Sequence, residues 1–192
     1  MQVKVIEEHG HDAALRGMSY SFMDRSLDVN EWWHAQKPRA EKRAALLAPK
    51  EGGHNSFLET ITVWIDIEAC RAWWSEMDRY RVGKTQLSQS TMHTLAKRGP
   101  VPEDFEEGTH WRVIDAFTDV WLSAKGDINV LKMNLPEGFL QRRMVCLNYK
   151  VLRNIIAQRE GHRLKWWGVF IDEVLSQVQH PEYLKEKHDN KI

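Results

Sequence analysis

The sequence NYKVLRNIIAQR, which spans residues 148–159, is the best-defined helical segment of the chain. Asn148 and Arg159 are separated by 11 residues, close to three full turns, so a helix places both side chains on one face. Gly161 then breaks this helix from a second one. We predict helices over residues 147–159 and 163–179.

The rest of the chain indicates a mixture of helices and strands. Further helices are predicted over residues 10–18, 38–48, 68–77 and 106–125, and strands over residues 2–7 and 57–67. The second strand is supported by its β-branched and aromatic residues. Residues 79–105 are less regular, and Gly99, Pro100 and Pro102 mark a loop there.

These elements predict an α+β fold, with a twisted, mostly antiparallel sheet flanked by helices. The sequence has no internal repeat, low-complexity tract or linker that would divide it. We therefore predict a single domain over residues 1–192, which ends in a charged tail at residues 181–192.

The composition is that of an ordinary globular protein, with 42% hydrophobic and 28% charged residues in 192. Lys plus Arg and Asp plus Glu number 27 each, and this balance gives no overall electrostatic case for binding nucleic acid or a membrane. No apolar run approaches the roughly 20 residues that span a bilayer. The first residues alternate in polarity, unlike a secretory signal. We therefore predict a soluble, cytoplasmic protein.

The cysteines and tryptophans narrow the kinds of site that are expected. Cys70 and Cys146 are far apart and form no CxxC motif, so we predict neither a disulfide framework nor a metal site. Six of the nine tryptophans come in pairs, at 32–33, 73–74 and 166–167. We interpret these pairs as packing in a core or at a subunit interface, because stacking platforms for bases would be accompanied by net positive charge.

Four segments match, in order and spacing, the motifs of one known enzyme family. GHNSFLET at 53–60 is similar to that family's GHxSPFEH, and IDIEAC at 65–70 leads without a gap to RYR at 79–81, similar to FxIKAP…RHR. Leu135-Pro136 follows Lys132, where the family has arginine. The segment 148–159 is similar to NxRxLxNFxxLR, and 162–166 continues it where the family has an AQWEIR-like helix. The chain thus resembles the flavin-dependent thymidylate synthases, over roughly residues 13–25 and 41–178.

The resemblance implies a FAD-dependent enzyme that methylates dUMP, or a related pyrimidine nucleotide, at C5. Methylenetetrahydrofolate and NADPH would be the co-substrates, and the family assembly would be a homotetramer with FAD held between subunits. The residues implied to hold FAD are Ser19, His54, Ser56, Arg79, Tyr80, Arg81, Asn148 and Asn154. Arginine pairs suit phosphate oxygens because they make charge-assisted hydrogen bonds.

The same resemblance places residues at the nucleotide. Arg159 is the implied catalytic residue, because its guanidinium would stabilise negative charge that develops on the pyrimidine ring. The residues implied to bind the substrate are Glu76, Ser88, Gln89, Ser90, Lys132 and Arg159. Neither cysteine falls on a position that the family uses, and its chemistry needs no cysteine nucleophile.

The nucleotide-binding signature departs from the family pattern. The family has RHRxxSxNExSxRY, whereas residues 79–92 here are RYRVGKTQLSQSTM. The central histidine is Tyr80, the glutamate is Leu87 and the late arginine is Thr91, while a one-residue insertion would restore a serine as Ser90. Glu76 replaces a glutamine, and Lys132 keeps a positive charge without the bidentate fork. The flavin site is therefore better supported than the dUMP site.

Other functions stay open at this point. The chain could be a diverged relative that acts on another pyrimidine nucleotide, or a catalytically silent flavin- or nucleotide-binding paralogue. A nucleic-acid-binding module would need a continuous basic face, and the available basic residues point in several directions on two helices. Those residues are Arg142, Arg143, Lys150, Arg153, Arg159, Arg163 and Lys165.

Overall fold

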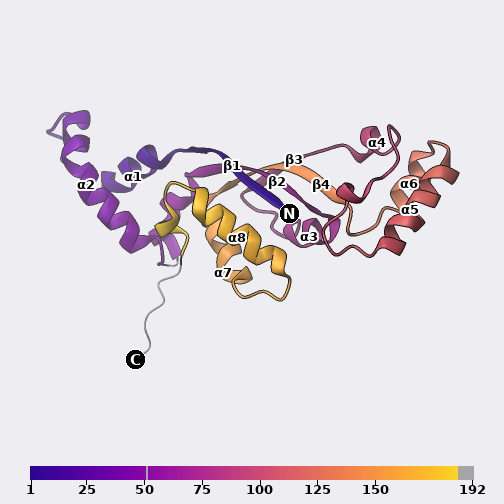
Figure 1. The fold of residues 1–192 in the computed structure, drawn as a ribbon. Coiled ribbons are helices and arrows are strands. Elements are labelled where there is room, and N and C mark those ends of the chain that lie inside the picture. The colour runs from indigo at the N-terminus through magenta and orange to yellow at the C-terminus, as the bar shows by residue number, and fades with distance from the viewer. Residues whose placement is uncertain (51, 186–192) are drawn as a thin grey trace, which may run out of the picture. The chain divides into compact units, whose positions relative to one another are not determined.

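A computed structural model describes residues 1–50 and 52–185 of the chain (Figure 1). The strands are β1 (Gln2–His9), β2 (Thr62–Cys70), β3 (Lys84–Ser88) and β4 (Leu140–Asn148). The helices are α1 (His11–Ser19), α2 (Val29–Leu47), α3 (Arg71–Met77), α4 (Thr91–Thr94), α5 (Trp111–Ala124), α6 (Ile128–Met133), α7 (Tyr149–Arg159) and α8 (Lys165–Gln177). Short 3-10 turns occur at Tyr20–Phe22, Gly52–Glu59, Pro102–Asp104 and Pro181–Tyr183.

The strands form one four-stranded antiparallel sheet in the order β1-β2-β4-β3. Strand β2 occupies a central position, and its side chains alternate between buried and half-buried, as expected for a strand with one fully covered face. Helices and an antiparallel sheet together confirm the predicted α+β class.

The chain divides into two compact units. Unit 1 contains residues 1–3, 66–80 and 86–145, and unit 2 contains residues 4–65, 81–85 and 146–192. Each of the four strands passes from one unit to the other along its length. The single-domain organisation stays a prediction, and residues 186–192 of the predicted charged tail lie outside the described residues.

The core of unit 2 contains the buried faces of α7 and α8. In α7 the buried residues include Leu152, Ile155 and Ile156, which share one face at helical spacing. Trp167 and Phe170 of α8 are fully buried, with their rings edge to face at 5.9 Å between centroids. Burial of these faces, rather than helix propensity, is the main stabilising term for such short helices.

The core of unit 1 contains a cluster in which Leu95, Phe105, Phe117, Leu131 and Leu135 are buried. Separately, Trp73 and Trp74 of α3 are fully buried and pack edge to face at 4.8 Å. Five of the six paired tryptophans are buried in the two units, namely Trp32, Trp33, Trp73, Trp74 and Trp167. This burial favours packing as the role of the pairs.

Several predicted boundaries were wrong. The helix predicted over 38–48 begins at Val29, because Asp28 caps it by accepting hydrogen bonds from the N–H groups of Asn30 and Glu31. Pro38 lies inside this helix and does not end it.

The strand predicted over 57–67 starts only at Thr62, after the 3-10 turn, and residues 68–70 extend it instead of starting a helix. Strands β3 and β4 and helix α6 were missed, and Leu147 belongs to β4 rather than to a helix. Strand β4 was missed because it contains two arginines, which are uncommon in a half-buried strand. In the folded chain these charges are paired, Arg142 with Asp66 and Arg143 with Asp78.

Candidate functional site

The residues that the motifs single out are divided between the two units. Unit 2 contains Ser19, His54, Ser56, Arg81, Asn148, Asn154 and Arg159. Unit 1 contains Glu76, Arg79, Tyr80, Ser88, Gln89, Ser90 and Lys132.

The N-terminal end of α7 is where three motif-bearing segments meet in unit 2. Asn148 is the N-cap, and its Oδ1 accepts the N–H of Val151 at 2.9 Å. The Asn148 N–H donates to the carbonyl of Gly83 at 3.3 Å, and the Tyr149 N–H donates to the carbonyl of Ile61 at 2.9 Å. Helix α7 is thus joined to the segment after Arg81 and to the segment after Glu59.

Gly83 allows the approach of its segment to Asn148. Its φ of +68° lies in the left-handed region that favours glycine. A Cβ at this position would lie 2.8 Å from Val151 Cγ2 and 2.9 Å from Asn148 Nδ2. The absence of a side chain at Gly83 therefore leaves room for the Asn148 amide.

An ion pair joins two of the motifs directly. Lys150 Nζ lies 2.5 Å from Glu59 Oε1, and both side chains are substantially exposed. Lys150 stands at the arginine of NxRxLxN and Glu59 at the glutamate of GHxSPFEH, so the pair unites the first and fourth motifs. Sequence reasoning did not select either residue, although opposite charges at two motif positions were a usable signal.

Tyr149 anchors the start of α7 from inside the unit. The residue is fully buried, and its hydroxyl donates to Glu8 on β1. The other carboxylate oxygen of Glu8 accepts the Gln179 N–H at 2.8 Å. Burial, followed by the hydrogen bond to Glu8, raises the pKa of Tyr149 far above its usual value, so the phenol stays protonated.

Ser19, at the end of α1, has an unusual environment. It is 1% exposed, and within the described part of the chain its hydroxyl has no hydrogen-bond partner. Buried hydroxyls nearly always have a partner, so this hydroxyl keeps an unfilled hydrogen-bonding capacity inside unit 2. His54 and Ser56 are exposed in the turn Gly52–Glu59.

The C-terminal part of α7 carries the remaining unit 2 residues. Asn154 is exposed and its Oδ1 accepts from Gln158 Nε2 at 2.9 Å. The guanidinium of Arg159 lies 4.5 Å from the centre of the Trp167 ring, and its Nη1 lies 3.0 Å from His162 Nε2. Eleven residues of helix correspond to about 16 Å of rise, so Asn148 and Arg159 mark opposite ends of α7.

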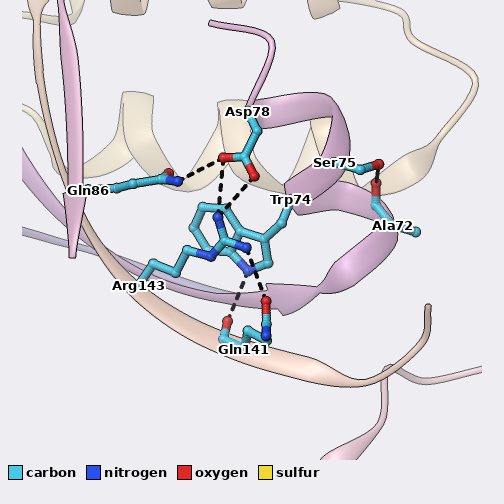
Figure 2. A network of polar contacts seen from close by, with 7 residues as sticks. All are labelled: Ala72, Trp74, Ser75, Asp78, Gln86, Gln141 and Arg143. Atoms are coloured by element: carbon cyan, nitrogen blue, oxygen red, sulfur yellow. Dashed lines mark hydrogen bonds and ion pairs between the residues drawn. The ribbon is translucent and has the colours of Figure 1, made fainter. Parts of the chain in front are cut away.

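In unit 1, a polar network holds the residue that precedes Arg79 (Figure 2). Asp78 accepts hydrogen bonds from Arg143 Nη1 at 3.1 and 3.2 Å and from Gln86 Nε2 at 2.8 Å. Arg143 also donates to Gln141 Oε1 at 3.0 Å and stacks on the Trp74 ring at 4.3 Å. These contacts link Asp78, at the C-terminal end of α3, to Gln86 on β3 and Arg143 on β4.

The residues predicted to bind the nucleotide are less closely associated. Ser88, Gln89, Ser90 and Lys132 are all exposed, and Lys132 is on α6, apart in sequence from the others. The Gln89 N–H donates to the Arg142 carbonyl at 2.9 Å, which fixes the backbone after β3. No hydrogen bond joins these four side chains to one another within residues 1–50 and 52–185.

Gln89 also borders a pocket of about 560 Å³ in unit 1. Phe117, Trp121 and Phe139 line its apolar side, and the ion pair Arg98–Asp104 lies on its polar side. The Trp121 ring is fixed by its Nε1, which donates to the Leu95 carbonyl at 2.8 Å. Of the predicted site residues, Gln89 is the one that this pocket includes.

The ionisation of the cysteines bears on the chemistry that is available. Burial raises the pKa of both thiols, at Cys70 and at Cys146. Both thiols are therefore neutral near pH 7 and are not activated as nucleophiles.

Among the described residues, no group of three or more His, Cys, Asp or Glu is placed to hold a metal ion. Of the helices that the structure describes, none is long and apolar enough to cross a membrane.

Comparison with known proteins identifies the fold. No family model matches the chain, and no curated protein matches it. A structure of flavin-dependent thymidylate synthase ThyX from Helicobacter pylori complexed with FAD and dUMP matches with a TM-score of 0.77 and 14% identity, over 96% of this chain and 98% of that one. A second structure of ThyX from Helicobacter pylori with FAD and dUMP gives a TM-score of 0.72 and 14% identity, over 96% and 97%. The chain therefore has a fold like that of the flavin-dependent thymidylate synthases.

Proposed function

We propose that this chain is a FAD-dependent enzyme of the thymidylate synthase type. Its reaction would be the reductive methylation of dUMP, or a related pyrimidine deoxynucleotide, at C5, with methylenetetrahydrofolate and NADPH as co-substrates. The observation that carries the proposal is the meeting of three motif-bearing segments at the start of α7, at Asn148, Gly83 and the Lys150–Glu59 pair. The shared fold with two FAD- and dUMP-bound structures supports it.

The residues proposed to hold FAD have suitable groups to offer. The side chains of Arg79 and Arg81 are exposed and make no hydrogen bond or ion pair with the described residues, so their guanidinium groups can take phosphate oxygens. The buried Ser19 hydroxyl has an unfilled hydrogen-bonding capacity. The side-chain oxygen of Asn148 accepts the N-cap hydrogen bond, and its amide N–H groups can donate to a ligand. His54, Ser56, Tyr80 and Asn154 complete the proposed set.

FAD, when bound, supplies hydride-transfer chemistry that no amino-acid side chain provides. The proposed contribution of Arg159 is electrostatic, because its positive charge would stabilise an anionic pyrimidine ring. Stacking on Trp167 and contact with His162 hold its guanidinium plane in place before any ligand arrives. Glu76, Ser88, Gln89, Ser90 and Lys132 are proposed to border the nucleotide.

We also propose that the chain assembles as a homotetramer whose subunits share sites, in the cytoplasm. Light scattering after size-exclusion chromatography should then give the mass of four chains. A monomer that binds FAD and turns over would contradict the shared site.

A retuned or silent paralogue is the second candidate, and one observation favours it. At the signature's glutamate stands Leu87, an apolar side chain that is 65% exposed, and at its late arginine stands Thr91, which is 8% exposed. Neither side chain can grip a phosphate as a guanidinium does. This candidate predicts FAD binding without methylation of dUMP.

The decisive experiment is a visible absorption spectrum of the purified protein with FAD, followed by separate additions of dUMP, dCMP and their ribose analogues. A bound flavin whose spectrum shifts with one nucleotide supports the enzyme and names its substrate. A bound flavin that no nucleotide perturbs supports the paralogue. A protein that takes up no FAD overturns both candidates.

A further inference from the structure

The network around Asp78 has features that stability alone does not explain. A carboxylate at the C-terminal end of a helix meets the negative end of the helix dipole, which is unfavourable. Asp78 occupies that position on α3. Its charge is offset by Arg143, which comes from β4, 65 residues later.

Arg143 is half-buried and its partner Asp78 is exposed, with 13% and 43% of their side chains accessible. The Arg143 Nε is buried and has no partner among residues 1–50 and 52–185. A partly exposed pair contributes little to stability, so the role of these contacts is to define one geometry. Here four contacts fix the guanidinium: two to Asp78, one to Gln141 and one to the face of Trp74.

The residue that this geometry fixes is Asp78, directly before Arg79 (Figure 2). The Arg79 N–H donates to the Glu76 carbonyl at 3.2 Å, so the turn that carries Arg79 continues from the clamped end of α3. The side chain of Arg79 is exposed and is not held by hydrogen bonds or ion pairs to the described chain. The backbone that Asp78 anchors therefore fixes the point from which the Arg79 side chain extends.

We propose that Asp78 and Arg143 are positioning residues, which aim Arg79 at a phosphate group of the bound nucleotide cofactor. This inference rests on the proposed function, because it takes FAD as the phosphate-bearing ligand. In a chain whose signature has lost its glutamate and late arginine, fixing the backbone before Arg79 keeps one guanidinium ready for that phosphate. A preorganised cation binds more tightly because less freedom is lost on binding.

The sign of the charge change separates positioning from simple electrostatics. Asp78→Asn removes a negative charge close to Arg79, so an electrostatic effect alone would tighten the binding of an anion. Arg143→Gln removes a positive charge and would by itself weaken it. Positioning predicts that both variants weaken FAD binding, each by about tenfold, the loss that corresponds to one misplaced phosphate contact.

Asp66 provides a matched control. It forms a bidentate pair with Arg142, at 2.9 and 3.1 Å to Nε and 2.9 Å to Nη2, on the position of β4 next to Arg143. Asp66→Asn removes the same charge and breaks the same type of pair in unit 1, without touching Asp78. We expect its FAD dissociation constant to stay within about twofold of the wild type, since Asp66 pairs with Arg142 and not with Asp78 or Arg143.

The experiment measures FAD dissociation constants by flavin fluorescence quenching at fixed ionic strength for the wild type, D78N, R143Q, D66N and R79A. Urea unfolding of each variant confirms that it is folded. Weaker binding in D78N and R143Q, with D66N unchanged, is the expected result. Opposite effects of D78N and R143Q, or an equal loss in D66N, overturn the inference.

The Arg79 variant separates the positioning role of Asp78 from the proposed function. If R79A weakens FAD binding and D78N does not, the positioning role falls and the proposed function stands. If R79A binds FAD as the wild type does, Arg79 is not a phosphate ligand and both assignments fall at this position. A wild type that binds no FAD overturns the proposed function as a whole.

Discussion

The N-terminal end of α7 in unit 2 and the segment of residues 87–91 in unit 1 differ in how closely they match the family motifs. At α7, Asn148, Gly83 and the Lys150–Glu59 pair make contacts within the chain. In the segment 87–91, Leu87 is exposed, and Thr91 is buried where the family signature carries arginine. At α7 the residues at the motif positions also have partners within the chain, so a change there should cost stability. At Leu87 and Thr91 the chain differs from the signature while the fold persists.

Substitution of Gly83 is expected to have the largest effect on the contacts at the start of α7. Gly83→Ala places a Cβ 2.8 Å from Val151 and 2.9 Å from Asn148, at a φ of +68°. We expect the free energy of unfolding to fall by about 2–3 kcal/mol, the sum of backbone strain and displacement of the cap. Urea denaturation measures this loss, and FAD affinity should fall with it.

Gly161→Ala is the control for Gly83. Its φ is +69°, and a Cβ there meets no described atom within 4 Å apart from its neighbours in sequence. Only the strain remains, so the expected loss is about 1 kcal/mol. Equal losses in the two variants would mean that the contact with Asn148 contributes nothing.

Substitutions of Asn148 test whether this residue both stabilises the fold and binds FAD. Asn148→Ala should lower the free energy of unfolding by about 1 kcal/mol, because the Val151 N–H loses its cap. Asn148→Asp keeps an oxygen for the cap but removes the amide N–H groups, so stability should hold while FAD affinity falls. Urea unfolding gives the free energy of unfolding of each variant, and FAD titration gives its FAD dissociation constant. An aspartate variant that binds FAD normally would reduce Asn148 to a structural residue.

The stability of the fold around helix α1, which carries Ser19, should depend on pH. His11 of α1 stacks on His180 at 3.6 Å and its Nε2 lies 3.3 Å from the Tyr183 hydroxyl. Burial, and then His180, lowers the pKa of His11 from its usual 6.5, and the effect of Lys37 is in the same direction, whereas Glu41 and Asp12 oppose it. The folded chain thus disfavours the protonated ring.

Stability linked to His11 is complete above pH 6.5 and is lost as pH falls through the lowered pKa of the folded state, because the unfolded chain binds the proton more readily. His11→Gln should flatten this dependence between pH 8 and pH 5.5. The effect should be smaller than that of Asn148→Ala. Urea midpoints at both pH values measure it, and an unchanged slope in the variant would assign the pH response to another group.

The sequence predicted helices α7 and α8 well because both have long, uninterrupted patterns. It did not predict β4, since Arg142 and Arg143 are uncharacteristic of a half-buried strand until their partners are known. Asp78 is 65 residues from Arg143, and no local pattern connects them. The Lys150–Glu59 pair lies within two recognised motifs and could have been found from charge alone. Local periodicity thus fixes elements, whereas pairings between distant charges emerge only from the fold.

Substitution of Glu76 is expected to have the smallest effect, and it tests the proposed nucleotide-binding residues of unit 1. It brings a negative charge to a position where the family has a neutral glutamine, near residues proposed to bind an anionic nucleotide. Glu76→Gln should therefore tighten dUMP binding by about threefold, the size expected of one partly screened charge. Isothermal titration of the FAD-loaded protein measures this, with Glu107→Gln as the control, because Glu107 is an exposed carboxylate elsewhere in unit 1. Equal tightening in both variants would reflect net charge alone. Tightening for a different nucleotide, with none for dUMP, would mean that the divergence in unit 1 changed the substrate rather than abolished its site.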